Sequence, residues 1–423
     1  MKEPASPLRI ADFRKFWFAR FASVLATSGM VVIIGYQIYD VARADYGMSI
    51  AAASFQLGLL GFAQFVPLML LTPVAGVVAD RFDRRKVAAS AMAVDFLVAL
   101  GLAIVTATEL RSLPVLFALA ALHGSVRVFV GPAMGAIAPN VVPAGLIPRA
   151  IALNSIGTQA GAVAGPASFG FLFASHRALP YWASTGLLVL AIISVLAIST
   201  MPPPPSEARR AHPVRQIVGG FQFVWSERFL LGCISLDLFA VLLGGATALL
   251  PVFARDILHV GPEGLGQMRA APAVGAAIVA LVLSWRPLAR DVGLKMLLSV
   301  GAYGAMTLAF GLSRHFLLSL GLLSLLGAAD MVSVFIRSSL IQLNTPDDMR
   351  GRVSAISGLA ISASNELGEL QSGFAAALLG ATGAVVFGGA GAIFVTVVWA
   401  MLFPELLRAR SFAPQYRLRE SET

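Results

Sequence analysis

The stretch GVVADRFDRR at residues 76–85 stands between two apolar segments, near 54–79 and 87–108. In it a glycine is followed by an Asp-Arg step and then by two adjacent arginines. Glycine permits tight helix packing, and the charged side chains can form charge-assisted hydrogen bonds to neighbouring helix ends. Bonds of this kind can break and re-form when helices move, so the stretch is expected to act in conformational gating. The residues expected to take part are Gly76, Asp80, Arg81, Arg84 and Arg85. The alternative is that the stretch is a plain anchor of positive charge at a membrane surface.

The composition is that of a membrane protein. Of the 423 residues 57% are hydrophobic and only 13% are charged, with a mean hydropathy of +0.81. Soluble domains carry about 25% charged residues. The basic residues fall in short connections between apolar runs, which fits membrane topology and argues against nucleic-acid binding. The one cysteine, Cys233, excludes an internal disulfide framework or a cysteine metal cluster.

Apolar runs of about 20 residues are long enough to cross a bilayer as helices. The sequence therefore predicts an all-α membrane protein with twelve transmembrane helices. The expected spans are 16–40, 54–79, 87–108, 113–138, 150–174, 180–201, 229–254, 264–286, 293–313, 316–343, 352–379 and 383–403.

The distribution of positive charge predicts the orientation. Loops and tails on the side of the termini hold 22 of the 31 Lys and Arg residues, and the opposite loops hold five, namely Arg43, Arg111, Arg177, Arg255 and Arg314. Positive residues stay on the cytoplasmic side. Both termini of this multi-pass protein are thus expected on the cytoplasmic side.

The two halves of the sequence resemble each other. Val142-Pro143, followed after five residues by Arg149, is echoed by Thr345-Pro346 and Arg352, an offset of 203 residues from 149 to 352. Each copy connects the fourth and fifth spans of its own half, as a parallel duplication of six helices predicts. The expected organisation is an N-terminal half at 1–201, a cytoplasmic linker at 202–228, a C-terminal half at 229–404 and a cytoplasmic tail at 405–423.

The linker opens with four prolines at 202–205. Apolar residues then recur at helical spacing, which predicts an amphipathic helix on the cytoplasmic face. The alternative is an ordinary linker helix packed on the bundle. The apolar residues of this segment are Val214, Ile217, Val218, Phe221 and Val224.

Charges inside the predicted spans are candidates for a transport cavity. An arginine at mid-membrane depth costs about 3 kcal/mol, so Arg127 should face a partner or a wet cavity. The repeat offset carries position 127 to Asp330, and we expect these two residues to form an ion pair that protonation or substrate breaks. A static structural bridge is the alternative.

Further polar residues complete the predicted substrate and proton cavity. Glu366 and Glu369 are three residues apart on one helix face, which makes them a candidate proton carrier. Arg20 is the approximate repeat counterpart of Asp237, and Arg337 shares a helix face with Asp330. His123, one turn before Arg127, is either a hydrogen-bonded packing residue or a proton relay. Asp95 and Asp40 are the remaining acids in or near the spans.

No pattern indicates an enzyme. The five histidines are scattered, and neither metal-ligand spacing, nor a nucleophile with its base, nor a phosphate-cradling Gly-Lys-Ser/Thr loop occurs. We therefore expect no cofactor and no metal, and energy supplied by an ion gradient or by the substrate's own gradient.

The motifs together resemble the major facilitator superfamily, and its enterobactin exporter branch in particular. The resemblance rests on residues 18–21, 76–86, 201–205 and 344–352. It implies an inner-membrane, proton-driven exporter of a siderophore or another small amphipathic compound, acting as a monomer by alternating access. An uptake carrier or a lipid flippase on the same fold is the alternative, and a non-transporting membrane scaffold is another.

Two span motifs are similar to those of antiporters in this superfamily. Arg127 with Gly131 resembles the Arg-x-x-x-Gly pattern of proton-coupled drug antiporters. The fifth span resembles the antiporter signature, although Phe169 replaces one glycine; helix packing is the alternative role of this spacing. The antiporter-like residues are Gly161, Gly165, Pro166 and Gly170.

Overall fold

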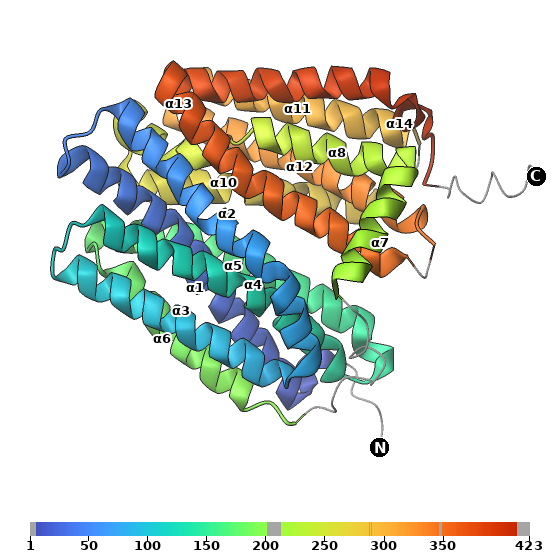
Figure 1. Cartoon of the computed structure of the whole chain (residues 1–423), viewed down its shortest axis with the longest axis horizontal. Coiled ribbons are helices and arrows are strands. Elements are labelled where there is room, and N and C mark those ends of the chain that lie inside the picture. The colour runs from blue at the N-terminus through green and yellow to red at the C-terminus, as the bar shows by residue number, and fades with distance from the viewer. Residues whose placement is uncertain (1–5, 201–212, 287, 289, 347–348, 413–423) are drawn as a thin grey trace, which may run out of the picture. The chain divides into compact units, whose positions relative to one another are not determined.

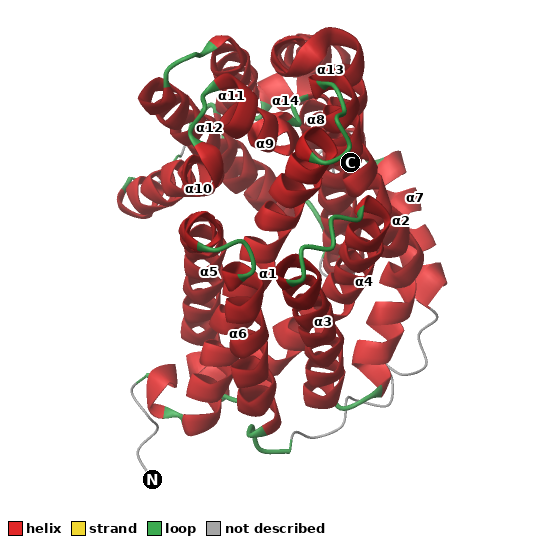
Figure 2. Ribbon diagram, turned by 90° about the vertical axis from the view of Figure 1, so that its left-hand side faces the viewer, coloured by secondary structure: helices red, strands yellow, loops and turns green. Residues whose placement is uncertain are grey.

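The computed structural model of the chain describes residues 6–200, 213–286, 288, 290–346 and 349–412. Within these ranges the polypeptide folds into helices joined by short turns and forms no strand (Figure 2). The predicted all-α fold is confirmed. The prolines predicted to open the linker, at 202–205, and the last residues of the predicted tail lie outside the described ranges.

Figure 1 labels the helices in chain order. Those before the central linker are α1 (Ala11–Ala44), α2 (Ile50–Arg81), α3 (Arg84–Ala107), α4 (Leu113–Ile137), α5 (Ile147–Ser175) and α6 (Leu179–Leu196). Those from the linker onward are α7 (Pro213–Ser226), α8 (Arg228–Leu243), α9 (Leu250–Val252), α10 (Gly261–Trp285), α11 (Val292–Leu312), α12 (Phe316–Leu343), α13 (Arg350–Leu402) and α14 (Pro404–Arg408).

Ten helices in the described part of the chain are long and apolar enough to cross a membrane. The chain is therefore a multi-pass helical membrane protein. α5 is helical over 29 residues but falls outside this set, because polar residues such as Asn154 and Gln159 dilute its hydropathy. α13 covers two of the predicted spans, and its backbone leaves the helical region at Gly380, with φ 74° and ψ 164°.

The span that begins with α8 is interrupted where a continuous helix was expected. α8 ends at Leu243, and a 3₁₀ turn, α9 and a π-helical turn carry the chain to Ile257. The Gly244-Gly245 pair permits the break, and side chains compensate the freed carbonyls. The Tyr303 hydroxyl donates to Gly244 O (3.1 Å) and the Ser372 hydroxyl to Gly245 O (3.0 Å).

The chain forms two compact units. The first comprises Met1–Met48, Phe62–Pro213 and His259–Ala270, and the second comprises Ser49–Gly61, Val214–Leu258 and Ala271–Thr423. The boundaries cut through α2 and α10. Each of these helices contributes its N-terminal part to one unit and its remaining residues to the other.

Close helix packing in the first unit rests on the small residues of α5. A Cβ atom added to Gly161 would lie 3.1 Å from Leu25 N and Phe21 O of α1. At the next positions of the stripe, Gly165 lies against Ser28, and the Phe169 ring fills the space beside Gly29. The bulky residue in the antiporter-like stretch is thus accommodated by a glycine on the facing helix.

The duplicated connection carries the same backbone hydrogen bond in both copies. The Leu146 N–H donates to Pro143 O (2.9 Å), and the Met349 N–H donates to Pro346 O (3.0 Å). The helices that follow, α5 and α13, begin at Ile147 and Arg350. From 147 to 350 the offset is the 203 residues of the sequence repeat, so the repeat extends from the sequence to the local backbone.

Candidate functional site

A cluster of charged side chains lies inside the second unit. Asp237 of α8 forms an ion pair with Arg337 of α12, and both side chains are almost wholly buried. Asp330 lies on α12, two turns before Arg337, where the charges of Asp237 and Arg337 both act on its carboxyl group. Tyr303 of α11 is close enough to both carboxylates to interact with them electrostatically. α8 and α12 therefore supply two acids and one guanidinium to the cluster, and α11 adds a tyrosine.

The charge balance of this cluster has a chemical consequence. Two ionised carboxylates beside one guanidinium leave one negative charge in excess, and an uncompensated buried charge is costly. One proton neutralises that excess. Sequence spacing placed Arg337 and Asp330 on one face of a helix, but it did not identify Arg337 as the partner of Asp237, because that pairing depends on how α8 packs against α12.

The predicted arginines of the first unit have polar neighbours from other helices. Arg20 Nε donates to Thr158 Oγ1 of α5 (3.2 Å). Arg127 Nη1 donates to Gln64 Oε1 of α2 at 3.4 Å, a long bond to a buried amide. The predicted pair of Arg127 and Asp330 joins residues of different units and stays a prediction.

His123 of α4 pairs with Asp95 of α3. The distance from Nδ1 to Oδ1 is 2.6 Å, and the two side chains are 0% and 1% exposed. The other ring nitrogen, Nε2, is buried and has no hydrogen-bond partner among the described residues. The pair is thus a buried dyad with one unused nitrogen. The sequence identifies both residues as polar groups within predicted spans, but it does not show their contact, because they are 28 residues apart.

The two glutamates of α13 lie beside the N-terminal part of α2, within the second unit. A Cβ atom on Gly61 would lie 2.8 Å from Glu369 Cβ and 3.1 Å from Glu366 O. Glu366 is buried and Glu369 is partly buried. The absence of a side chain at Gly61 therefore allows α2 to approach the helix face that carries both acids.

The loop between α2 and α3 is held by Asp83. Its carboxylate caps α3 by accepting from Arg85 N (3.0 Å), and it binds Arg85 Nη2 (2.7 Å). Arg85 Nη1 in turn donates to Ile198 O, just beyond the end of α6 (2.5 Å). The hydrogen bond from Arg85 holds the pKa of Asp83 below its usual value.

The structure gives fewer contacts for the other predicted gating residues. Arg81 is exposed and Arg84 is partly exposed. The surroundings of Gly76 and the side chain of Asp80 lie outside the described part of the chain. The gating role of this loop stays a prediction, and Arg85 contacts the chain just beyond the end of α6.

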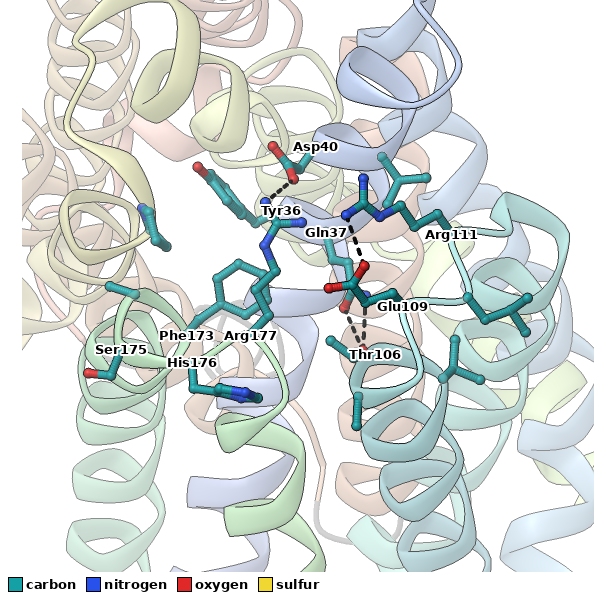
Figure 3. Close-up of a pocket in the computed structure, with 16 residues that line it drawn as sticks. Tyr36, Gln37, Asp40, Thr106, Glu109, Arg111, Phe173, Ser175, His176 and Arg177 are labelled. Atoms are coloured by element: carbon teal, nitrogen blue, oxygen red, sulfur yellow. Dashed lines mark hydrogen bonds and ion pairs between the residues drawn. The ribbon is translucent and has the colours of Figure 1, made fainter.

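A polar pocket of 530 Å³ opens in the first unit among α1, the α3–α4 loop and the α5–α6 loop (Figure 3). At its wall Arg177 pairs with Asp40 (3.3 Å), and Gln37 accepts from the Tyr181 hydroxyl (2.6 Å). Arg111 lines it too and binds Asp45 (2.6 Å), whose carboxylate raises the pKa of the guanidinium. In the sequence, Arg111 and Arg177 indicate only the topology of the membrane spans. The sequence signal that indicates this pocket is an acidic residue, Asp40, near the end of the first predicted span.

Comparison with known proteins places these features in a family. A family model described as "Transmembrane secretion effector" matches residues 2–420. The enterobactin exporter EntS of Escherichia coli O1:K1 is 29% identical over 420 residues, which cover 97% of this chain and 96% of that protein.

Solved structures share the fold at low sequence identity. The nucleoside transporter NupG matches with a TM-score of 0.74 at 11% identity, over 93% of this chain and 99% of that one. A D-xylose–proton symporter matches with a TM-score of 0.70 at 14% identity, over 92% and 98%. Likeness at this level concerns the fold alone.

Proposed function

The chain belongs to the transmembrane secretion effector family of the major facilitator superfamily, whose members are transporters and not enzymes, and we propose that it exports a small amphipathic compound of siderophore type in exchange for protons. The match to enterobactin exporters over nearly the full length supports the cargo class and the direction. The observation that carries the proton coupling is the excess carboxylate of the Asp237, Asp330 and Arg337 cluster.

The proposed architecture has twelve spans in two six-helix halves. α5 supplies the span missing from the ten apolar helices, and the break at Gly380 divides α13 into two. The shared turn before α5 and α13 supports the duplication. With twelve spans both termini lie on one side, and the positive charges of the loops put that side in the cytoplasm of a bacterial inner membrane. The transporter is proposed to act as a monomer.

Protonation of Asp330 is the proposed coupling step. In the proposed deprotonated state Asp330 is ionised beside the Asp237–Arg337 pair, and its predicted partner is Arg127 at the repeat-related position. A proton on Asp330 removes the excess charge, leaves Arg337 paired with Asp237 and breaks the predicted pair of Asp330 with Arg127. Because alternating access rearranges one half against the other, a charge that changes partners can bias the exchange between its two states.

The remaining predicted residues take supporting parts in this proposal. Glu366 and Glu369 border the substrate path, and Arg20 and His123 contribute polar groups from the first half. The charged loop at Arg81, Arg84 and Arg85 gates the conformational change together with Gly76 and Asp80. The α5 stripe of Gly161, Gly165, Pro166 and Gly170 permits the close packing that an antiporter keeps while its halves move.

Asp330→Asn tests the coupling. In proteoliposomes with an imposed pH gradient, we expect the variant to lose gradient-driven efflux of its substrate while still exchanging substrate between the two sides without a gradient. Retained exchange separates lost coupling from misfolding. Asp330→Glu keeps a titratable group and is the matched control, expected to retain coupled transport. Intact proton-driven efflux by Asp330→Asn would sink the assignment, and gradient-driven uptake in the unmodified protein would instead indicate a carrier of the opposite direction.

A further inference from the structure

The linker helix α7 has one side already occupied by protein. Val224 is buried in the apolar core of the second unit, beside Leu230 and Val353. Four residues earlier, Gly220 lies against α13, where an added Cβ atom would be 3.1 Å from Arg352 Cβ. Positions four apart lie on one face of a helix. This face is the contact that holds α7 to its own unit.

A second face of α7 carries large apolar side chains that are exposed. Val218 is 46% exposed, Phe221 53% and Trp225 66%. These residues are three and four apart and therefore form one stripe along the helix. The rings of Phe221 and Trp225 stack at a centroid distance of 5.7 Å. Gln222 and Ser226, also exposed, lie on the side turned away from the packed face.

The position of α7 in the chain puts this stripe near a membrane boundary. α8, which begins a membrane-crossing segment, starts at Arg228, two residues after α7 ends. Arg228 is anchored there by Glu405 (3.4 Å) and by Leu402 O (3.0 Å), where α13 ends and α14 begins. Tryptophan and arginine concentrate at the headgroup level of a bilayer. Trp225 thus lies within one turn of the start of this membrane-crossing segment.

We propose that the stripe of Val218, Phe221 and Trp225 inserts into the headgroup region of the phospholipid bilayer, so that α7 is a surface helix held between lipid and protein. An apolar face with a polar flank is the pattern of such helices. The inference concerns the linker alone and is independent of substrate and proton coupling.

Site-specific labelling of the full-length protein tests this proposal. Cys233 is the one native cysteine and is buried, so Cys233→Ser gives a background for single labels. Phe221→Cys, carrying an environment-sensitive fluorophore, is compared with Gln222→Cys, the adjacent exposed position on the polar side. Both are reconstituted in nanodiscs of phosphatidylglycerol and phosphatidylcholine. Trp225→Cys repeats the measurement within the stripe and replaces Phe221→Cys should that variant fail to fold.

The expected result is quenching of the Phe221→Cys label by brominated phospholipids, severalfold stronger than for Gln222→Cys, with the opposite order for aqueous iodide. Equal iodide quenching at both positions would overturn the proposal, because the stripe would then face water. Protection of the Phe221→Cys label from both quenchers would also overturn it, since protein and not lipid would cover the stripe.

Discussion

His123 and Asp95 occupy the interior of the first unit, with a short hydrogen bond between them and a ring nitrogen left unused. Two roles fit this geometry. The pair either fastens α3 to α4, or it holds a proton that transport displaces. The two roles differ in what the loss of both side chains does, since a fastening pair can be replaced by apolar residues of similar volume, whereas a proton site cannot.

Asp95→Leu is expected to lower the free energy of unfolding by about 3 kcal/mol or more, because it leaves His123 buried without its partner. Combining it with His123→Leu should recover most of that loss. Thermal unfolding of the purified variants in detergent measures both effects. The pH profile of transport decides the role: if the double variant keeps the unmodified profile, the pair is structural, and a flattened profile would contradict that assignment.

Asp83 remains ionised over the pH range from mildly acidic to neutral. Its folded pKa lies below the ordinary value of 3.8, so its contribution to stability is fully present above that value and is lost only as the pH falls through the lower, folded pKa. We therefore expect Asp83→Asn to slow transport by loosening the Arg85 contact without changing the shape of the pH profile between neutral and mildly acidic pH. Efflux rates across that range measure it, and an altered profile would identify Asp83 as a coupling group.

At the scale of single helices, the packing of α5 on α1 depends on small residues at fixed positions. Gly165→Leu would drive a side chain into Ser28 and the backbone of Leu25, where an added Cβ atom already lies 2.6 Å from Leu25 O. Overpacking of this kind costs about 1–3 kcal/mol. Gly186→Leu in α6 is the control, since nothing lies within 4 Å of its added Cβ atom. Thermal stability in detergent should fall for the first variant only.

The break in α13 is set by one residue. Gly380 has φ +74° and open space around its Cβ position, so the cost of a substitution there comes from the backbone alone. We expect Gly380→Ala to destabilise the protein by about 1–3 kcal/mol, because a positive φ combined with ψ near 164° is a backbone conformation that essentially only glycine adopts. Gly358→Ala, in a regular and uncrowded part of the same helix, should be neutral or stabilising. Equal effects in a thermal unfolding assay would mean that the break is not strained.

At the scale of the molecule, the orientation in the membrane can be measured directly. Glu109, in the α3–α4 loop, and Phe82, in the α2–α3 loop, are both exposed and should lie on opposite sides. In intact cells a membrane-impermeant maleimide is expected to label Glu109→Cys without permeabilisation. Phe82→Cys should react only after permeabilisation. The reverse pattern would place both termini outside and overturn the orientation inferred from positive charge.

The scale of an interaction decides whether it is visible in the sequence. Helix positions follow from runs of apolar residues, a property of neighbours along the chain, and the helices lie close to the predicted spans. The break after Leu243 was missed because a Gly-Gly pair is tolerated within a helix unless other helices supply partners, as Tyr303 and Ser372 do. Phe169 is a similar case, because its fit depends on Gly29 of another helix.

By itself, the amino-acid sequence was sufficient for the helical membrane class, the family motif at residues 76–85 and the internal repeat, since hydropathy and spacing are read along the chain. Tertiary packing alone assigned Arg337 to Asp237, His123 to Asp95 and Arg85 to Ile198, and it alone assembled the polar pocket of the first unit. The physical reason is that a buried charge takes the partner that helix packing brings within reach, and no local pattern records which helix that is.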